Sequence, residues 1–132
     1  MEQRYLTDTS AVIKFLNNSF EPHVQQWMSI YLSTESNISI ITQIELLSWA
    51  VPNKNDQAIL NSFISASNLI GVSQEIVEKC AAIRKNYRLK LPDALISATA
   101  LVHNLTLVAD NDKDFALISE LSLINPKKLK LT

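Results

Sequence analysis

Short apolar runs alternate along the chain with longer segments in which apolar residues recur every three or four positions. The apolar and β-branched runs predict five short strands, at residues 4–7, 38–41, 69–72, 106–109 and 121–124. The helical spacing predicts helices near residues 12–16, 21–31, 42–49, 56–67, 73–87, 92–102 and 113–119. Because strands and helices alternate, we expect a mostly parallel sheet covered on both faces, in one three-layer α/β domain over residues 1–132.

The composition narrows the class of protein. The chain has 132 residues, of which 47% are hydrophobic and 19% charged, which is typical of a globular protein. The only cysteine, Cys80, fits a reducing compartment, and the N-terminus lacks the pattern of a secretory signal. No apolar run approaches the roughly 20 residues that span a bilayer. We therefore expect a cytoplasmic protein with no membrane partner. The only glycine, Gly71, excludes glycine-rich phosphate-binding loops.

Acidic residues recur where predicted strands meet helices. They are Asp8, Glu45, Asp93 and the group Asp110, Asp112 and Asp114. Residues that follow parallel strands lie at the carboxyl edge of the sheet, where α/β proteins bind ligands. Carboxylate oxygens without histidine or cysteine suit Mg²⁺ or Mn²⁺ better than zinc. The pattern thus predicts a divalent-metal site, although Asp93 follows a basic loop and not a strand.

Helix capping is the alternative interpretation of each acid taken singly. Asp is a favoured N-cap, and acids in a first turn complement the helix dipole. Thr42-Gln43-Ile44-Glu45 matches a capping box, and Pro92-Asp93 is an ordinary helix start. However, acids recur at several junctions, next to apolar runs that would bury them. Buried carboxylates repel one another unless a cation lies among them, so the set favours a metal site.

Four segments carry a resemblance to a known family. In order, YLTDTSAVI, TQIELL, KLPDALISATALVHNLTLV and DNDKDFALI resemble a PIN domain over essentially the whole chain. The short length and the final LINP are similar to VapC-type toxin ribonucleases. The resemblance implies a metal-dependent endoribonuclease that uses Mg²⁺ or Mn²⁺ to hydrolyse RNA. It also implies a homodimer that a cognate antitoxin protein neutralises.

The resemblance also implies the metal ligands: Asp8 from DTS, Glu45 from TQIE, Asp93 from LPDA and one acid of DNDKDF. Many relatives carry TRNVKDF where this chain has ADNDKDF, so the fourth position is open. We predict Asp112, with Asp110, Asn111 and Asp114 as alternatives, and expect Asp114 to cap the following helix. Asp8 and Asp93 would bind the main ion directly, while the other two complete its shell through water or hold a second ion. Thr9 and Ser10 are candidates to orient a carboxylate or the scissile phosphate.

A local basic group is the candidate RNA-binding surface. Arg84, Lys85, Arg88 and Lys90 lie within seven residues, just before Asp93, with no acid among them. We expect Arg84 and Arg88 to share one helix face and to contact phosphates. The tail lysines 127, 128 and 130 are expected to be solvated.

Other functions remain open on the sequence alone. A catalytically degenerate RNA- or partner-binding module would need the acids only as caps. Another Mg-dependent α/β phosphohydrolase is disfavoured, because no second acid follows Asp8 in the D-x-D pattern. An acid–base ribonuclease would need both histidines, His23 and His103. An apolar groove between helices 21–31 and 56–67 is expected to suit the antitoxin.

Overall fold

Every strand pairing is parallel in the computed structural model, which describes residues 3–131. Strand β4 (Thr106–Val108) pairs with β1 (Tyr5–Thr7) on one side and with β5 (Leu123–Ile124) on the other. Strand β2 (Asn37–Ser39) pairs with β3 (Asn68–Ile70). The Asn37 side-chain amide donates to the Tyr5 carbonyl at 2.9 Å and places β2 beside β1. The two-stranded sheet β2-β3 therefore lies beside the three-stranded sheet β1-β4-β5, and the spatial order across both is β3-β2-β1-β4-β5.

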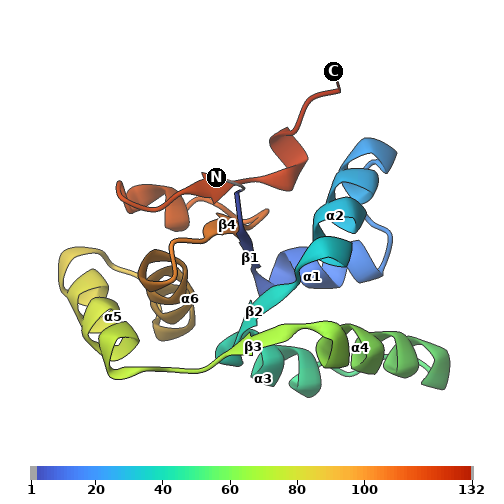
Figure 1. Cartoon of the computed structure of the whole chain (residues 1–132), viewed down its shortest axis with the longest axis horizontal. Helices are drawn as coiled ribbons and strands as arrows, with labels where there is room; N and C mark the ends of the chain where they lie inside the picture. The colour runs from blue at the N-terminus through green and yellow to red at the C-terminus, as the bar shows by residue number, and fades with distance from the viewer. Residues whose placement is uncertain (1–2, 132) are drawn as a thin grey trace.

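Six α-helices cover this sheet, and their bounds are α1 (Thr9–Leu16), α2 (Pro22–Thr34), α3 (Ile40–Ser48), α4 (Lys54–Ala66), α5 (Gln74–Asn86) and α6 (Leu91–Val102). Figure 1 shows α5 and α6 on one side of β1 and β4, and α1 and α2 on the other. The α/β class, with its mostly parallel sheet between two helical layers, is thus confirmed. No helix within residues 3–131 combines the length and hydrophobicity needed to cross a membrane.

The alternating side chains of the strands bury both faces of the sheet. Leu6 and Leu107 point toward α5 and α6 and are fully buried there against Ile76 and Ile96. Val108, the next residue of β4, belongs to the opposite cluster with Met28 of α2. Burying one such aliphatic side chain contributes about 1.5–3 kcal/mol, so both helical layers are held by the same short strands.

Three differences from the predicted elements affect residues of the candidate site. Helix α3 begins at Ile40 and not at Thr42, because the Ser39 hydroxyl accepts the Thr42 amide at 3.2 Å and caps the helix earlier. The helix expected over 113–119 is only a 3₁₀ turn, η1 (Phe115–Leu117). Helix α5 ends at Asn86, so Arg88 lies outside it. A second 3₁₀ turn, η2 (Pro126–Lys128), follows β5.

Candidate functional site

Four carboxylates line one pocket of about 270 Å³ at the carboxyl ends of β1 and β4. They belong to Asp8, Glu45, Asp93 and Asp114, and the pocket is completed by Thr9, Ser10, Ile13, Asn111 and Phe115. Asp8 follows β1, Glu45 lies in α3, and Asp93 lies in the first turn of α6. Three of the four predicted ligands therefore meet in one place, although 85 residues of chain separate Asp8 from Asp93.

Capping hydrogen bonds do not account for three of these acids, whereas Asp93 does lie in the first turn of α6, directly after Pro92. Asp8 precedes α1 and Asp114 precedes η1, yet neither side chain makes a capping hydrogen bond. Ser39 caps α3, so the capping box expected at Thr42–Glu45 is wrong. Glu45 instead accepts a hydrogen bond from the Thr9 hydroxyl at 2.6 Å. The expectation that Asp114 caps a helix is likewise wrong.

The carboxylates are close enough to disfavour one another's ionisation. Asp8 is only 7% exposed, and burial, followed by the charge of Asp93, raises its pKa to about 7. Glu45 adds to this effect, while a hydrogen bond with the Thr9 backbone opposes it. Burial also raises the pKa of Asp93, and the charges of Asp114 and Glu45 act in the same direction. A cation among these groups would relieve the repulsion.

Asp112 and Asp110, the other acids of the DNDKDF segment, face away from this arrangement. Asp112 is not among the pocket residues, and its carboxylate accepts from the Lys128 ammonium at 3.0 Å, which lowers its pKa. Asp110 is buried and bound by Ser10 and Lys14. The geometry therefore favours Asp114 over the predicted Asp112 as the fourth acid. The signal in the sequence was Phe115, which is 3% exposed and lines the pocket, so the backbone of Asp114 beside it lies at the pocket as well.

The side chains that line the pocket offer the type of ligand atom that Mg²⁺ and Mn²⁺ prefer, and they do so in one pocket. All the candidate ligand atoms are oxygens, from four carboxylates and the Asn111 side chain. Within residues 3–131, no three Asp, Glu, His or Cys side chains are close enough to form a ready-made metal cage. Binding of a cation would therefore require the side chains to move closer together. The exposed Asp114 can do so by rotating.

Comparison with known proteins agrees with this architecture. The PIN domain family model matches residues 5–121. The chain belongs to the PIN domain family. This PIN domain is 33% identical to a chain of a toxin–antitoxin complex from Klebsiella pneumoniae, with a TM-score of 0.74 and coverage of 95% of this chain and 99% of that one. A comparison with curated proteins gives no match.

Two further solved structures share the fold of the PIN domain at lower identity. A chain of VapBC2 from Rickettsia felis, bound to a DNA fragment from its promoter, is 23% identical with a TM-score of 0.79, over 93% of this chain and 98% of that one. A chain of DNA-bound VapBC from Salmonella typhimurium is 20% identical with a TM-score of 0.80, over 95% and 99%. These two likenesses show the fold of a PIN domain, in agreement with the family model.

Thr9 and Ser10 connect the start of α1 to two different carboxylates of this PIN domain. The Thr9 hydroxyl lies 2.6 Å from Glu45 Oε1 and 3.0 Å from the Thr42 hydroxyl. The Ser10 hydroxyl donates to Asp110 Oδ1 at 2.8 Å. Consecutive residues therefore hold α1 against α3 on one side and against the end of β4 on the other.

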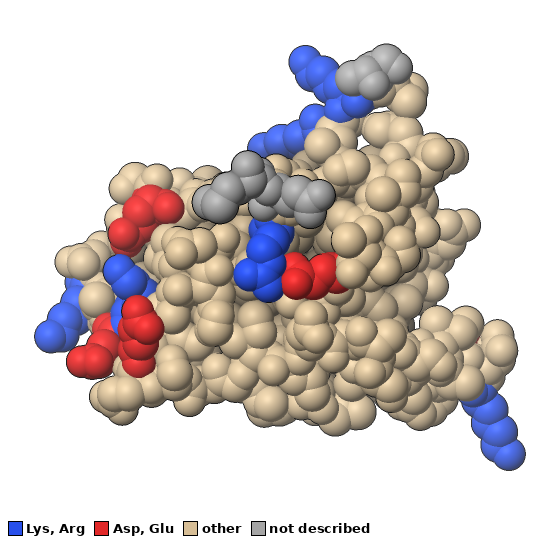
Figure 2. All heavy atoms as spheres, viewed as in Figure 1, with Lys and Arg blue, Asp and Glu red and all other residues tan. Residues whose placement is uncertain are grey.

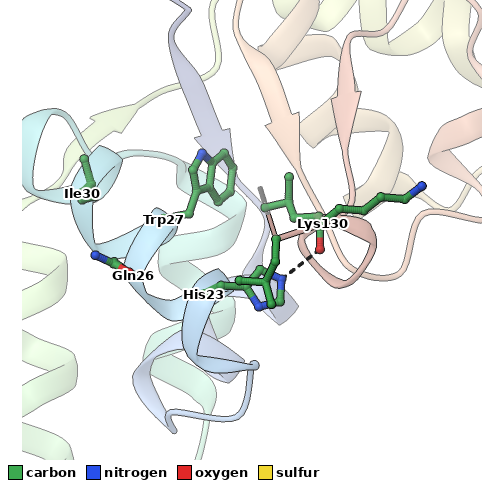
Figure 3. Close-up of a pocket in the computed structure, with 7 residues that line it drawn as sticks. His23, Gln26, Trp27, Ile30 and Lys130 are labelled. Atoms are coloured by element: carbon green, nitrogen blue, oxygen red, sulfur yellow. Dashed lines mark hydrogen bonds between the residues drawn. The ribbon is translucent and has the colours of Figure 1, made fainter.

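The two histidines lie outside the acidic pocket. His103 is the exposed C-cap of α6. A ring nitrogen of His23 lies 2.9 Å from the Leu129 carbonyl oxygen, where α2 meets the C-terminal tail. Figure 3 shows this contact beside a separate pocket of about 360 Å³, with Trp27 and Ile30 on α2 and Lys130 on the tail. Neither histidine is placed to serve as the acid or base of an RNA-cleaving pair at the carboxylates.

The sequence predicts a groove between helices α2 and α4, but these two helices belong to different hydrophobic clusters and are not direct neighbours. Trp27 of α2 packs with Tyr5 and Tyr31, whereas Trp49 packs around Leu60 of α4. Helix α1 contributes to both clusters and lies between α2 and α4 in Figure 1. Any partner on this side would therefore lie across α1.

The basic group lies on two elements and not on one helix face. Arg84 and Lys85 are in the last turn of α5, whereas Arg88 follows the end of the helix, so the expected shared face is wrong. Lys90 precedes α6, and its charge lowers the pKa of Asp93, which places it beside the pocket. In Figure 2, basic and acidic atoms are mixed over α5.

Proposed function

We propose that this PIN domain is a divalent-metal-dependent endoribonuclease that acts as a toxin and is neutralised by a cognate antitoxin. The observation that carries the proposal is the convergence of Asp8, Glu45, Asp93 and Asp114 on one pocket, where Asp8, Glu45 and Asp114 make no capping hydrogen bond. The raised pKa of Asp8 supports it, because a buried acid among acids is stabilised by a bound cation. The matched solved structures, which are toxin–antitoxin complexes, support the toxin role.

The rigidity of each residue indicates its role at the metal ion. Asp8 and Asp93 are short acids at the ends of regular elements and would bind the ion directly. Glu45, held by Thr9, and the exposed Asp114 would complete its shell. A bound Mg²⁺ or Mn²⁺ would lower the pKa of water and offset the charge that develops on the scissile phosphate. Asn111 supplies a neutral oxygen at the rim of the same pocket.

Substrate and partner contacts follow from charge and exposure. Lys90, beside Asp93, and the neighbouring Arg84, Lys85 and Arg88 would contact the RNA phosphates next to the acidic pocket. Such contacts position RNA without reading its sequence. We also propose a cytoplasmic homodimer, with the antitoxin covering the toxin in the assembled complex.

The test uses the full chain, a panel of cellular RNAs that includes tRNA, and Mg²⁺ or Mn²⁺. We expect cleavage that a chelator abolishes. Asp8→Asn and Asp93→Asn should each reduce the rate by more than about 100-fold, because indirect metal partners alone cost 10–100-fold. Glu78→Gln, an exposed acid on α5, is the matched control and should cleave at the wild-type rate. Wild-type cleavage by both folded pocket variants would rule out the metal site.

The same experiment separates the nuclease from its alternative. A degenerate module would bind RNA, or a partner protein, without metal-dependent cleavage. Gel-shift measurements on the uncleaved RNA, made in chelator, therefore accompany the rate measurements. Binding without cleavage in any metal would favour the module.

A further inference from the structure

A buried carboxylate lies just outside the acidic pocket, on Asp110. Its side chain is 1% exposed, and both of its oxygens are occupied. Oδ1 accepts from the Ser10 hydroxyl at 2.8 Å, and Oδ2 accepts from the Lys14 ammonium. The Lys127 ammonium lies 3.6 Å from Oδ2. Both oxygens thus have partners on α1 or the tail, and Asp110 is not among the residues that line the pocket.

Ser10 and Lys14, the two donors on α1, bind the Asp110 carboxylate together, and we call these three side chains the bracket. Ser10 and Lys14 are one helical turn apart, so they face the same way and reach a single carboxylate together. Burial opposes the ionisation of Asp110, but the hydrogen bonds from Lys14 and Ser10 lower its pKa below the ordinary value. The bracket is therefore a charged, buried link between α1 and the segment after β4.

The bracket and one backbone hydrogen bond attach the chain to β4 on both sides of the Asp8 side chain. The Asp8 amide donates to the Val108 carbonyl at 2.9 Å, just before α1 begins. Ser10 then joins α1 to Asp110, two residues beyond Val108. Asp8 thus lies between two attachments to the same end of β4, and its buried side chain lines the pocket.

The C-terminal tail supports the bracket from the other side. The Asn125 side-chain amide donates to the Asp110 carbonyl at 3.0 Å, and its own oxygen accepts from the Lys127 amide at 3.0 Å. Lys127 adds its charge to the carboxylate. Segments that are far apart in the sequence, α1, the end of β4 and the tail, therefore meet at one side chain.

We propose that Asp110 is a positioning residue: through Ser10 in the first turn and Lys14 in the last turn it holds α1 so that Asp8 is presented to the metal. This inference rests on the proposed function, in which Asp8 is a metal ligand. The competing explanation is that Asp110 only adds negative charge near the pocket. The two explanations predict different signs for the loss of Lys14.

The experiment measures Mn²⁺ binding to the full chain by electron paramagnetic resonance, for Lys14→Met, Asp110→Asn and the double variant. Positioning predicts that each single variant weakens binding about tenfold, the effect typical of lost outer-shell support. The double variant should be no weaker than either single variant, because both changes break the same link. A charge effect alone would make Lys14→Met bind Mn²⁺ more tightly and Asp110→Asn more weakly. That result, or unchanged binding, would overturn the proposal.

The chain contains a matched control pair. The surface ion pair of Asp112 and Lys128 is unsuitable, because Asp112 is itself an alternative metal ligand. The control is therefore the ion pair between Arg4, just before β1, and Glu35 at 2.9 Å, whose side chains are 56% and 33% exposed. Arg4→Met and Glu35→Gln remove the same charges and should leave Mn²⁺ binding within about twofold of wild type. If Lys14→Met does not fold, Ser10→Ala removes a single hydrogen bond of the bracket. This variant should weaken binding in the same direction, and wild-type binding would count against the proposal.

A second measurement separates this inference from the proposed function. If the wild-type chain takes up no Mn²⁺, the proposed metal site fails. Hydrogen exchange at the Asp8 amide still tests the bracket without a metal ion. We expect exchange to be faster in Lys14→Met and Asp110→Asn, relative to the Leu107 amide, which donates to the Ser122 carbonyl at 2.8 Å on the far side of β4. An equal change at both amides indicates general destabilisation and overturns the positioning role.

Discussion

At the scale of single residues, the environment of Asp8 determines how the site behaves. A carboxyl group ordinarily titrates near pH 4, whereas burial and the charge of Asp93 raise the pKa of Asp8 to about 7. Between these values the folded chain keeps a proton on Asp8 that the unfolded chain has released. Stability therefore falls as pH rises through this window, by up to about 1.4 kcal/mol for each pH unit.

The first prediction concerns this pH dependence in the metal-free protein. We expect the wild-type free energy of unfolding to decrease from pH 4 to pH 7, with the full penalty present above pH 7. Asp8→Asn should remove that part of the slope and stabilise the protein at pH 8 by about 1–4 kcal/mol. Urea unfolding at several pH values measures both effects, and Asp56→Asn on α4 is the control. If the free energy of unfolding of Asp8→Asn depends on pH as steeply as that of wild type, the raised pKa of Asp8 is contradicted.

The second prediction concerns the fourth acid. Asp114 lines the pocket, whereas the Asp112 carboxylate is held by Lys128. We therefore expect Asp114→Asn to lower the rate of metal-dependent RNA cleavage by about tenfold or more, and Asp112→Asn to change it less than about twofold. Initial rates at saturating and limiting Mn²⁺ distinguish lost metal binding from lost turnover. The reverse order of the two variants would restore Asp112 as the ligand.

At the scale of elements, small changes in where helices begin and end place the functional side chains. Ser39 caps α3 and so starts the helix at Ile40, which leaves Glu45 free to meet Thr9 and not the backbone. In the other helical layer, α5 ends at Asn86. The basic segment therefore extends past the end of the helix into the loop that leads to Lys90 and α6. The basic group is thus a helix end and a loop beside the pocket.

The third prediction tests this basic group. Arg84→Ala combined with Arg88→Ala should weaken RNA binding and flatten its salt dependence. Two lost phosphate contacts would reduce the slope of log K against log salt by about 1.4 for single-stranded RNA. Fluorescence anisotropy at several KCl concentrations, in chelator, measures the slope. The double variant Lys54→Ala/Lys130→Ala removes the same charge on α4 and on the tail, and an equal loss of slope there would mean that only net charge matters.

At the scale of the whole molecule, the β3 edge of the sheet combines an unpaired strand side with exposed apolar side chains, in the part of the chain that the structure describes. Strand β3 pairs only with β2 among the described residues, and Leu69 on this strand is 43% exposed. Val72 and Val77, which follow it, are each 46% exposed. An exposed strand edge with apolar neighbours is a surface that proteins commonly cover by association. This edge is where we place the interface of the proposed homodimer.

The fourth prediction follows from that placement. Sedimentation velocity should show a dimer, and Val72→Glu should weaken the dimer at least about tenfold, since a buried unpaired charge costs more than 1.4 kcal/mol. Ile59→Glu on α4 is the control, because Ile59 is 44% exposed on another surface. Equal effects of the two substitutions would place the interface elsewhere.

The sequence by itself determined the parallel α/β architecture, the family resemblance and three of the four acids that meet in the pocket. These features depend on local periodicity and on short motifs at the ends of strands and near the starts of helices, both of which are encoded within short segments. The tertiary structure alone decided that Asp114 and not Asp112 faces the pocket, and that Asp110 is engaged by Lys14. The physical reason is that each of these side chains takes its direction from a partner distant in the chain. Lys128 is 16 residues from Asp112 and Lys14 is 96 residues from Asp110, so no local pattern records the pairing.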